Sequence, residues 1–191
     1  MFRFAASDAS SSTWAIGHRR NTSFPLRSIR RTMNKTPAER AAVLIATWFG
    51  CGYFPVGPGT AGSAAALVIG ILVVRGSGMP AWGFALLTAA ALGPAIWAAG
   101  VTARVVGRKD PGLVVVDEVV GQWMTLAGAT TLNWKAYTSA FVLFRLFDIW
   151  KPWPVRNLEA LPSGTGIVAD DVMAGVYGAL VLYVAGCFNF Y

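Results

Sequence analysis

The chain has 191 residues, which is enough for one domain with its own core but short for two domains. Its hydrophobic fraction of 55%, charged fraction of 13% and mean hydropathy of +0.52 argue against an ordinary soluble protein, in which about 25% of residues are charged. The net charge of +7 is concentrated in residues 1–40. No groove-reading or RNA-stacking motif accompanies it, so we expect a membrane and no nucleic acid as partner.

Residues 1–32 are rich in Ser and Arg and contain neither a spanning stretch nor the apolar core of a signal peptide. We expect a basic, disordered N-terminal arm, and rank a transit peptide lower. Met33 begins a more ordinary opening and is a candidate translation start, which a mass spectrum of the native N-terminus would test. A single helical domain is expected over residues 33–191.

The first predicted helix runs from Thr36 to about Phe49. Thr36 suits the N-cap, Pro37 the first helical position and Glu39 the third, as a capping box requires. The segment that follows holds five glycines and two prolines, which should end the helix. Thr60 or Ser63 is then expected to cap the next apolar helix.

Two segments are long and apolar enough to cross a bilayer, residues 80–101 and residues 172–191. The runs 61–74 and 136–150 are shorter and suit core helices or partial spans. Residues 113–132 form an apolar segment interrupted by acids.

The run 136–150 should end at KPWP, because proline cannot continue a helix, and a linker with Pro162, Gly164 and Gly166 is expected after it. Gly175 and Gly178 are expected to allow close helix packing. Because no period-two alternation is sustained, we predict an all-α fold, an apolar helical bundle that is membrane-embedded or membrane-associated.

Acidic residues gather in this apolar sequence. A carboxylate is costly to desolvate and is retained where it is paired, hydrogen-bonded or bound to a metal. The functional candidates are therefore Asp117, Glu118, Asp148, Asp170 and Asp171. Each also has a purely structural explanation, because the first two could accept structural hydrogen bonds, the third could pair with Arg145 or Lys151, and the last two could cap a helix.

The glycine-rich segment before residue 64 is a candidate for binding phosphate. The segment GPGTAGS offers hydroxyls, amides and a helix N-terminus, although a tight turn between helices is an equally good interpretation. The motifs of histidine, cysteine and aspartyl phosphatases are absent, because the sole histidine is His18, Cys51 lacks the required arginine and Asp148 lacks a second aspartate. Carboxylates without soft ligands favour Mg²⁺ over zinc.

Four segments together resemble the phosphatidylglycerophosphatase A family: GYFPVGPGTAGS, DPGLVVVDEVVGQW, FVLFRLFDIWKPWPVR and GTGIVADDVMAGVYGALV. The resemblance runs from about Phe49 to Val181. It implies a Mg²⁺-dependent phosphatase that converts phosphatidylglycerophosphate to phosphatidylglycerol in phospholipid synthesis at the bacterial inner membrane. At the matching positions, the metal and catalytic candidates are the five acids above, and the candidates for holding the phosphate are Thr60, Ser63, Arg145, Lys151 and Arg156.

Two other classes of function stay open at this point. A small membrane cation transporter or channel subunit could use intramembrane carboxylates as ion sites, and would show ion flux in liposomes without phosphate release. A noncatalytic scaffold would use every acid as a cap or salt bridge, and neutralising an acid would then change only the melting temperature. The basic arm places the N-terminus, and with it the expected active site, on the cytoplasmic side. The sequence does not indicate an oligomeric state.

Overall fold

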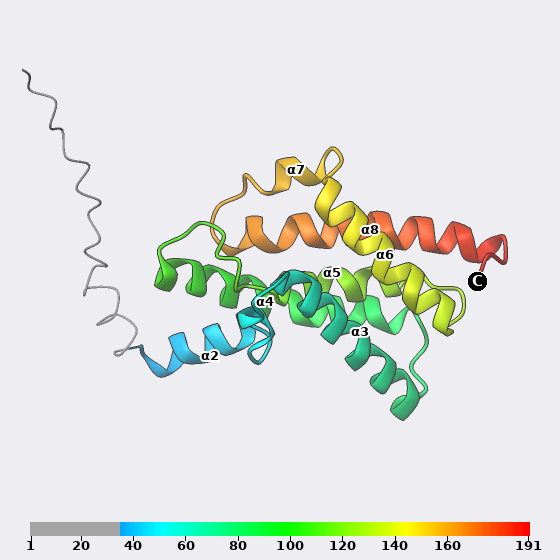
Figure 1. The fold of residues 1–191 in the computed structure, drawn as a ribbon, viewed down its shortest axis with the longest axis horizontal. Coiled ribbons are helices and arrows are strands. Elements are labelled where there is room, and N and C mark those ends of the chain that lie inside the picture. Colours follow the sequence, from blue (N-terminus) through cyan, green and yellow to red (C-terminus); the bar gives the residue numbers. More distant parts are fainter. Residues whose placement is uncertain (1–34) are drawn as a thin grey trace, which may run out of the picture. The chain divides into compact units, whose positions relative to one another are not determined.

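The structure, a computed structural model, describes residues 35–191, which form helices joined by short loops and contain no β-strand (Figure 1). This confirms the predicted all-α class. The predicted arm, residues 1–32, lies outside the described residues and stays a prediction. The elements in chain order are α2 (Pro37–Ala46), η1 (Cys51–Tyr53), α3 (Pro58–Ser77), α4 (Gly83–Val106), α5 (Val116–Leu126), α6 (Trp134–Trp150), α7 (Val155–Leu158) and α8 (Gly164–Cys187).

Helix α2 begins with the predicted capping box. The Thr36 hydroxyl accepts a hydrogen bond from the Glu39 amide at 3.2 Å, and the Glu39 carboxylate accepts one from the Thr36 amide at 2.8 Å. The helix ends at Ala46, earlier than the predicted Phe49. Trp48 and Phe49 adopt left-handed backbone conformations, so the chain turns away before the glycine-rich segment begins.

Helix α3 begins before the predicted caps. Gly57, in a left-handed conformation, stands at the N-cap, and Pro58 occupies the first helical position, where its missing N–H leaves no bond unmade. Thr60 and Ser63 therefore lie inside the helix, and the Ser63 hydroxyl donates to the Gly59 carbonyl at 2.9 Å. The helix has 20 residues, so the shorter run predicted at 61–74 underestimated it.

Helix α8 also begins earlier than expected, at Gly164, where the sequence suggested a linker. A side chain at Gly164 would collide with the Ile96 carbonyl of α4, and one at Gly166 would collide with the Leu161 carbonyl. These glycines therefore serve close packing at the start of a helix. Asp170 and Asp171 lie in the second turn of α8, so the cap interpretation is wrong for both.

Three of the described helices are long and apolar enough to cross a membrane: α3, α4 and α8. The predicted span at 80–101 corresponds to α4, and the one at 172–191 corresponds to the later part of α8. Helix α6 has 17 residues and is not among them. It ends at Trp150, just before Pro152 and Pro154, as the prolines of KPWP predicted.

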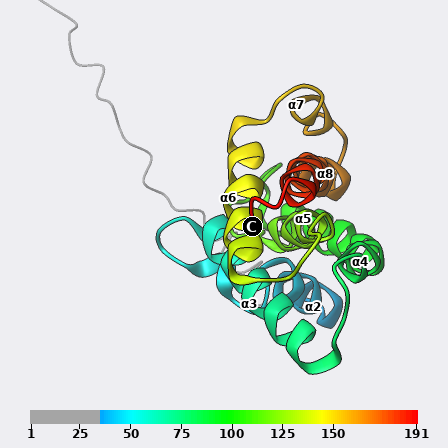
Figure 2. The same cartoon turned by 90° about the vertical axis from the view of Figure 1, so that its right-hand side faces the viewer.

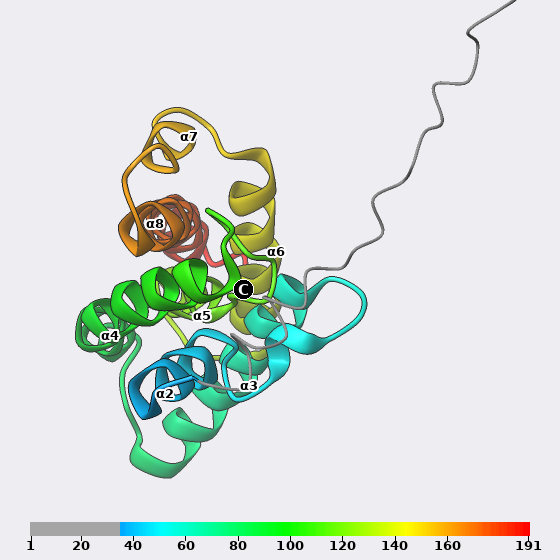
Figure 3. The ribbon, with the colours of Figure 1, turned by 90° about the vertical axis from the view of Figure 1, so that its left-hand side faces the viewer.

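Helix α5 lies in the middle of the bundle, surrounded by α3, α4, α6 and α8 (Figures 2 and 3). Nine of its eleven residues are buried. The Trp123 indole donates to the Ala66 carbonyl of α3 at 3.1 Å, and the Thr125 hydroxyl donates to the Gly175 carbonyl of α8 at 3.2 Å. The short acid-bearing segment that cannot span is therefore held on several sides by the longer helices.

Candidate functional site

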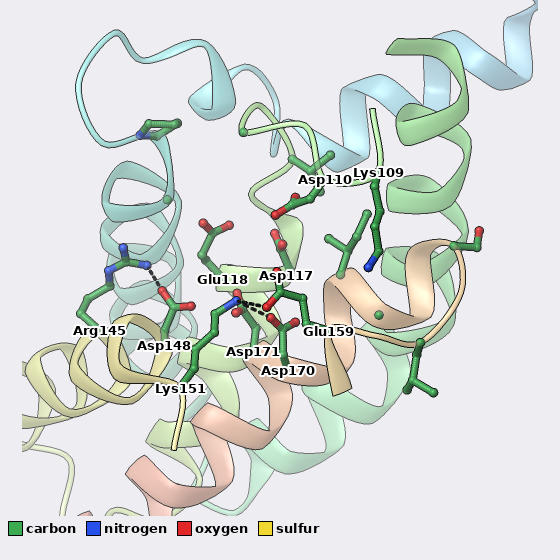
Figure 4. A pocket seen from close by; sticks show the side chains of 18 of the residues that line it. Lys109, Asp110, Asp117, Glu118, Arg145, Asp148, Lys151, Glu159, Asp170 and Asp171 are labelled. Atoms are coloured by element: carbon green, nitrogen blue, oxygen red, sulfur yellow. Dashed lines mark hydrogen bonds and ion pairs between the residues drawn. The ribbon is translucent and has the colours of Figure 1, made fainter. Parts of the chain in front are cut away.

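A cavity of about 310 Å³ lies at one end of the bundle. Here the N-termini of α3, α5 and α8 meet the C-termini of α4 and α6, so residues far apart in sequence share one pocket (Figure 4). All five predicted acids line it, together with Arg145 and Lys151. The sequence therefore identified seven pocket residues, although it could not show how they are arranged.

Three carboxylates converge in this pocket, and we call them the carboxylate cluster: Asp117, Glu118 and Asp171. One oxygen from each lies within 4.8 Å of the other two. The first two acids occupy the first turn of α5, and the third belongs to α8. Asp117 and Asp171 are only 7% and 4% exposed, so water does little to screen their mutual repulsion.

Glycines allow α5 and α8 to approach closely enough to form this cluster. A side chain at Gly175 would collide with the backbone of Gly121, and one at Gly121 would come within 2.7 Å of the Asp171 carbonyl. Gly178 lies against Thr125 in the same contact. The sequence predicted close packing at Gly175 and Gly178, and the structure confirms it for this helix pair.

Two ion pairs flank the carboxylate cluster. Arg145 donates to Asp148 at 2.5 Å within α6, and the Lys151 ammonium donates to Asp170 of α8 at 2.6 Å. Glu159 lies 3.8 Å from Lys151, at the edge of the pocket. Asp148 and Asp170 therefore each have a protein cation close by, whereas no member of the carboxylate cluster has an ion-pair partner among the described residues.

Burial, and after it the negative charge of Glu118, raise the pKa of Asp117 well above its usual range. Burial likewise raises the pKa of Glu118. The Asp117 Oδ1 and Glu118 Oε2 atoms are buried without a hydrogen-bond partner. Buried carboxylate oxygens that repel one another and lack donors suit a divalent cation, which would offset their charge and hold them ionised.

Lys151 is held in an uncommon conformation at the C-terminus of α6. Its φ angle is 47°, in the left-handed region that disfavours side chains other than glycine. Burial lowers the pKa of its ammonium, but the hydrogen bond and the attraction of Asp170 raise it by more, so the net shift is upward. The strained backbone thus carries a cation that remains charged and pointed at α8.

The other residues predicted to hold phosphate lie outside the pocket lining. Thr60 is exposed, Ser63 is buried with its hydroxyl bonded within α3, and Arg156 is exposed on α7. The glycine-rich segment nevertheless reaches the pocket through Gly57, Pro58 and Gly59. It contributes the N-terminal backbone of α3 rather than the predicted hydroxyls.

Sequence reasoning assigned no role to Lys109 or Ser163, and it grouped Asp110 with the clustered acids without including it in the predicted site. Lys109 and Asp110 lie on the loop between α4 and α5, and Ser163 precedes α8. A polar break between apolar segments was the available signal for the loop pair. It did not reveal that the loop folds over the same cavity as residues 40 or more positions later.

Comparison with known proteins gives consistent matches. A family model described as Phosphatidylglycerophosphatase A matches residues 44–186. The chain is 37% identical to "Phosphatidylglycerophosphatase A" of Escherichia coli, over 75% of the chain and 82% of that protein. The protein of the same name from Haemophilus influenzae is 37% identical, over 73% of the chain and 85% of the relative.

A third relative carries a different name. The chain is 42% identical to "Putative phosphatidylinositol-3-phosphatase" of Bacteroides thetaiotaomicron, over 75% of the chain and 92% of that protein. No solved structure matches the chain. All three names describe a phosphatase that acts on a phosphorylated phospholipid headgroup.

Proposed function

The chain belongs to the phosphatidylglycerophosphatase A family, and we propose that it is a Mg²⁺-dependent lipid phosphatase that hydrolyses phosphatidylglycerophosphate to phosphatidylglycerol and phosphate. The observation that carries this proposal is the convergence of Asp117, Glu118 and Asp171 beside Arg145 and Lys151. An acid-lined pocket repels a phosphomonoester unless positive charge is added, so the carboxylates and the substrate both call for a cation.

The carboxylate cluster would hold the ion. Its oxygen-only donor set favours Mg²⁺, because zinc sites ordinarily include nitrogen or sulfur ligands. When bound, Mg²⁺ supplies positive charge that stabilises the phosphate oxygens as the reaction proceeds. The cluster keeps its shape because α5 and α8 are packed through glycine contacts.

The cations and backbone amides would hold the terminal phosphate. Arg145 can donate N–H groups to phosphate oxygens, with Asp148 orienting its guanidinium. Gly59 brings the N-terminus of α3 against Glu118 and Arg145, where the helix dipole favours a bound anion. In the reaction, the oxygen of water bonds to phosphorus, the bond from phosphorus to the glycerol oxygen breaks, and that oxygen takes up a proton.

The pocket suits a headgroup and not a whole lipid. A volume of about 310 Å³ lies at the lower end of the range for ligand sites, so acyl chains would remain outside. Exposed aromatic side chains adjoin the pocket residues in sequence: Tyr53 and Phe54 precede Gly57, while Trp150 and Trp153 flank Lys151. Tyr and Trp are the residues that favour a membrane interface.

The same end of the bundle would face the cytoplasm at the bacterial inner membrane. Among residues 58–191, Arg75 and Lys135 lie near the far ends of their helices. Six cations lie near the site end: Arg104, Arg108, Lys109, Arg145, Lys151 and Arg156. The positive-inside rule assigns the richer end to the cytoplasm. Asp170 and Asp171 are about 10 Å from the start of α8, a helix about 36 Å long, which favours an interfacial site.

Two alternatives are tested together with this proposal. The Bacteroides relative makes a phosphorylated inositol lipid a second candidate substrate. A cation transporter would place its carboxylates near mid-bilayer, and the position of Asp170 and Asp171 near one end of α8 speaks against it.

The deciding experiment measures phosphate release by the purified full chain in mixed micelles. Phosphatidylglycerophosphate, phosphatidate and phosphatidylinositol 3-phosphate are compared, each with Mg²⁺ and with a chelator. We expect the highest kcat/KM for phosphatidylglycerophosphate, and no release with chelator. Faster release from the inositol lipid would reassign the substrate, while ion flux in liposomes without release from any lipid would overturn the phosphatase proposal.

A further inference from the structure

Three cations line the pocket, and they differ in their surroundings. Arg145 and Lys151 are each hydrogen-bonded to an aspartate of the pocket. Lys109 also lines the pocket, but none of the ion pairs among residues 35–191 involves it. Its charge is therefore not committed to a protein carboxylate.

Lys109 reaches the pocket from a different side. In Figure 4 its side chain extends toward the cavity on the side of the carboxylates away from Arg145. The two cations thus border one cavity with the carboxylate cluster between them. A single phosphate beside the cluster and Arg145 leaves the charge of Lys109 without an anion.

The loop that carries Lys109 is fixed at both ends. On one side Gly107 ends α4 in a left-handed conformation, and the Arg108 amide donates to the Ala103 carbonyl at 3.2 Å. On the other side the Val115 amide donates to the Ala46 carbonyl of α2 at 2.8 Å. Lys109 therefore starts from a backbone anchored next to the pocket.

We propose that Lys109 binds the phosphodiester of the lipid substrate, the group that joins its headgroup to diacylglycerol. This rests on the proposed function, in which Arg145 and the carboxylate cluster hold the terminal phosphomonoester. Phosphatidylglycerophosphate carries both groups, separated by one glycerol. Lys109 is then a specificity-determining residue that distinguishes a headgroup with two phosphates from one with a single phosphate.

The test compares two inhibitors of phosphatidylglycerophosphate hydrolysis in mixed micelles. Phosphatidylglycerol carries only the phosphodiester, and inorganic phosphate mimics only the terminal group. For Lys109→Gln we expect KM for the substrate and Ki for phosphatidylglycerol to rise about tenfold, the effect of losing one charge-assisted contact. The kcat and the Ki for inorganic phosphate should stay unchanged.

Arg108→Gln is the matched control, because it removes the same charge from the adjacent, exposed position outside the pocket lining. We expect it to leave both Ki values unchanged. Equal changes in the two inhibition constants for Lys109→Gln, no change in either, or the same change in both variants would overturn the role of Lys109. Absence of phosphate release by the wild-type chain would instead overturn the proposed function, and the inference with it.

Discussion

The carboxylate cluster and the two ion pairs occupy the same pocket but solve the problem of buried charge differently. Asp148 and Asp170 each have a protein cation within 2.6 Å. Asp117, Glu118 and Asp171 lie close to one another and form no ion pair with any described residue. Asp148 and Asp170 have a counter-ion within the folded chain, whereas the cluster has none until a cation binds. Neutralising a cluster carboxylate should therefore stabilise the metal-free protein, whereas neutralising an ion-paired one should not.

Neutralising the cluster should give the largest effect. We expect Asp171→Asn to lower kcat on phosphatidylglycerophosphate by about 10³-fold, or about 4 kcal/mol of transition-state stabilisation. In chelator the same variant should melt about 2–4 °C above the wild-type protein, because one of three repelling charges is gone. Activity assays and thermal melts of the purified proteins check both effects. Loss of activity together with a lower melting temperature would indicate a structural acid instead.

Removing a cation of the ion pairs should cost less activity. Arg145→Ala should lower kcat by about 10²-fold, because a phosphate-binding donor is lost while the carboxylate cluster remains. Asp148→Asn should lower it by about tenfold, since Arg145 stays but loses its orienting partner. Steady-state kinetics of both variants test this order, which a larger loss for Asp148→Asn would contradict.

The close contact of α5 and α8 should be sensitive to a single methyl group. Gly175→Ala would force the two helices apart, destabilising the protein by about 1–3 kcal/mol and lowering activity about tenfold. Gly93→Ala is the matched control, because Gly93 lies inside α4 with open space around it. This substitution should stabilise the protein by about 0.5–1 kcal/mol. Equal melting temperatures and activities for the two variants would show that the close contact of α5 and α8 at Gly175 is not required.

The smallest effects should come from the pocket surroundings. Trp150→Ala with Trp153→Ala should raise KM for lipid in vesicles a few-fold and leave hydrolysis of a soluble phosphomonoester unchanged, because both tryptophans are exposed. Thr60→Ala and Arg156→Ala should change neither the KM for lipid nor the hydrolysis of the soluble substrate, since both side chains lie outside the pocket lining. Vesicle and soluble-substrate assays run side by side separate these cases.

The sequence predicted the helical class because no period-two alternation is sustained. It predicted the pocket acids because an acid in an apolar run is costly to bury unless it is paired, hydrogen-bonded or bound to a metal. It misjudged Gly164 and Gly166, which look like a linker, because only the structure shows the Ile96 and Leu161 carbonyls packed against them. The sequence also did not separate the three acids of the carboxylate cluster from the two acids that form ion pairs. The Arg145–Asp148 pair lies within α6 and follows from the spacing of three residues, whereas the Lys151–Asp170 pair depends on how α6 and α8 meet, which no local pattern encodes.

Binding of Mg²⁺ to the metal-free protein tests the carboxylate cluster most directly. Calorimetric titration should show binding to the wild-type chain and to Arg156→Ala, and none to Glu118→Gln or Asp171→Asn. Undiminished binding by both cluster variants would contradict the account, because the ion would then be held somewhere other than among these three carboxylates.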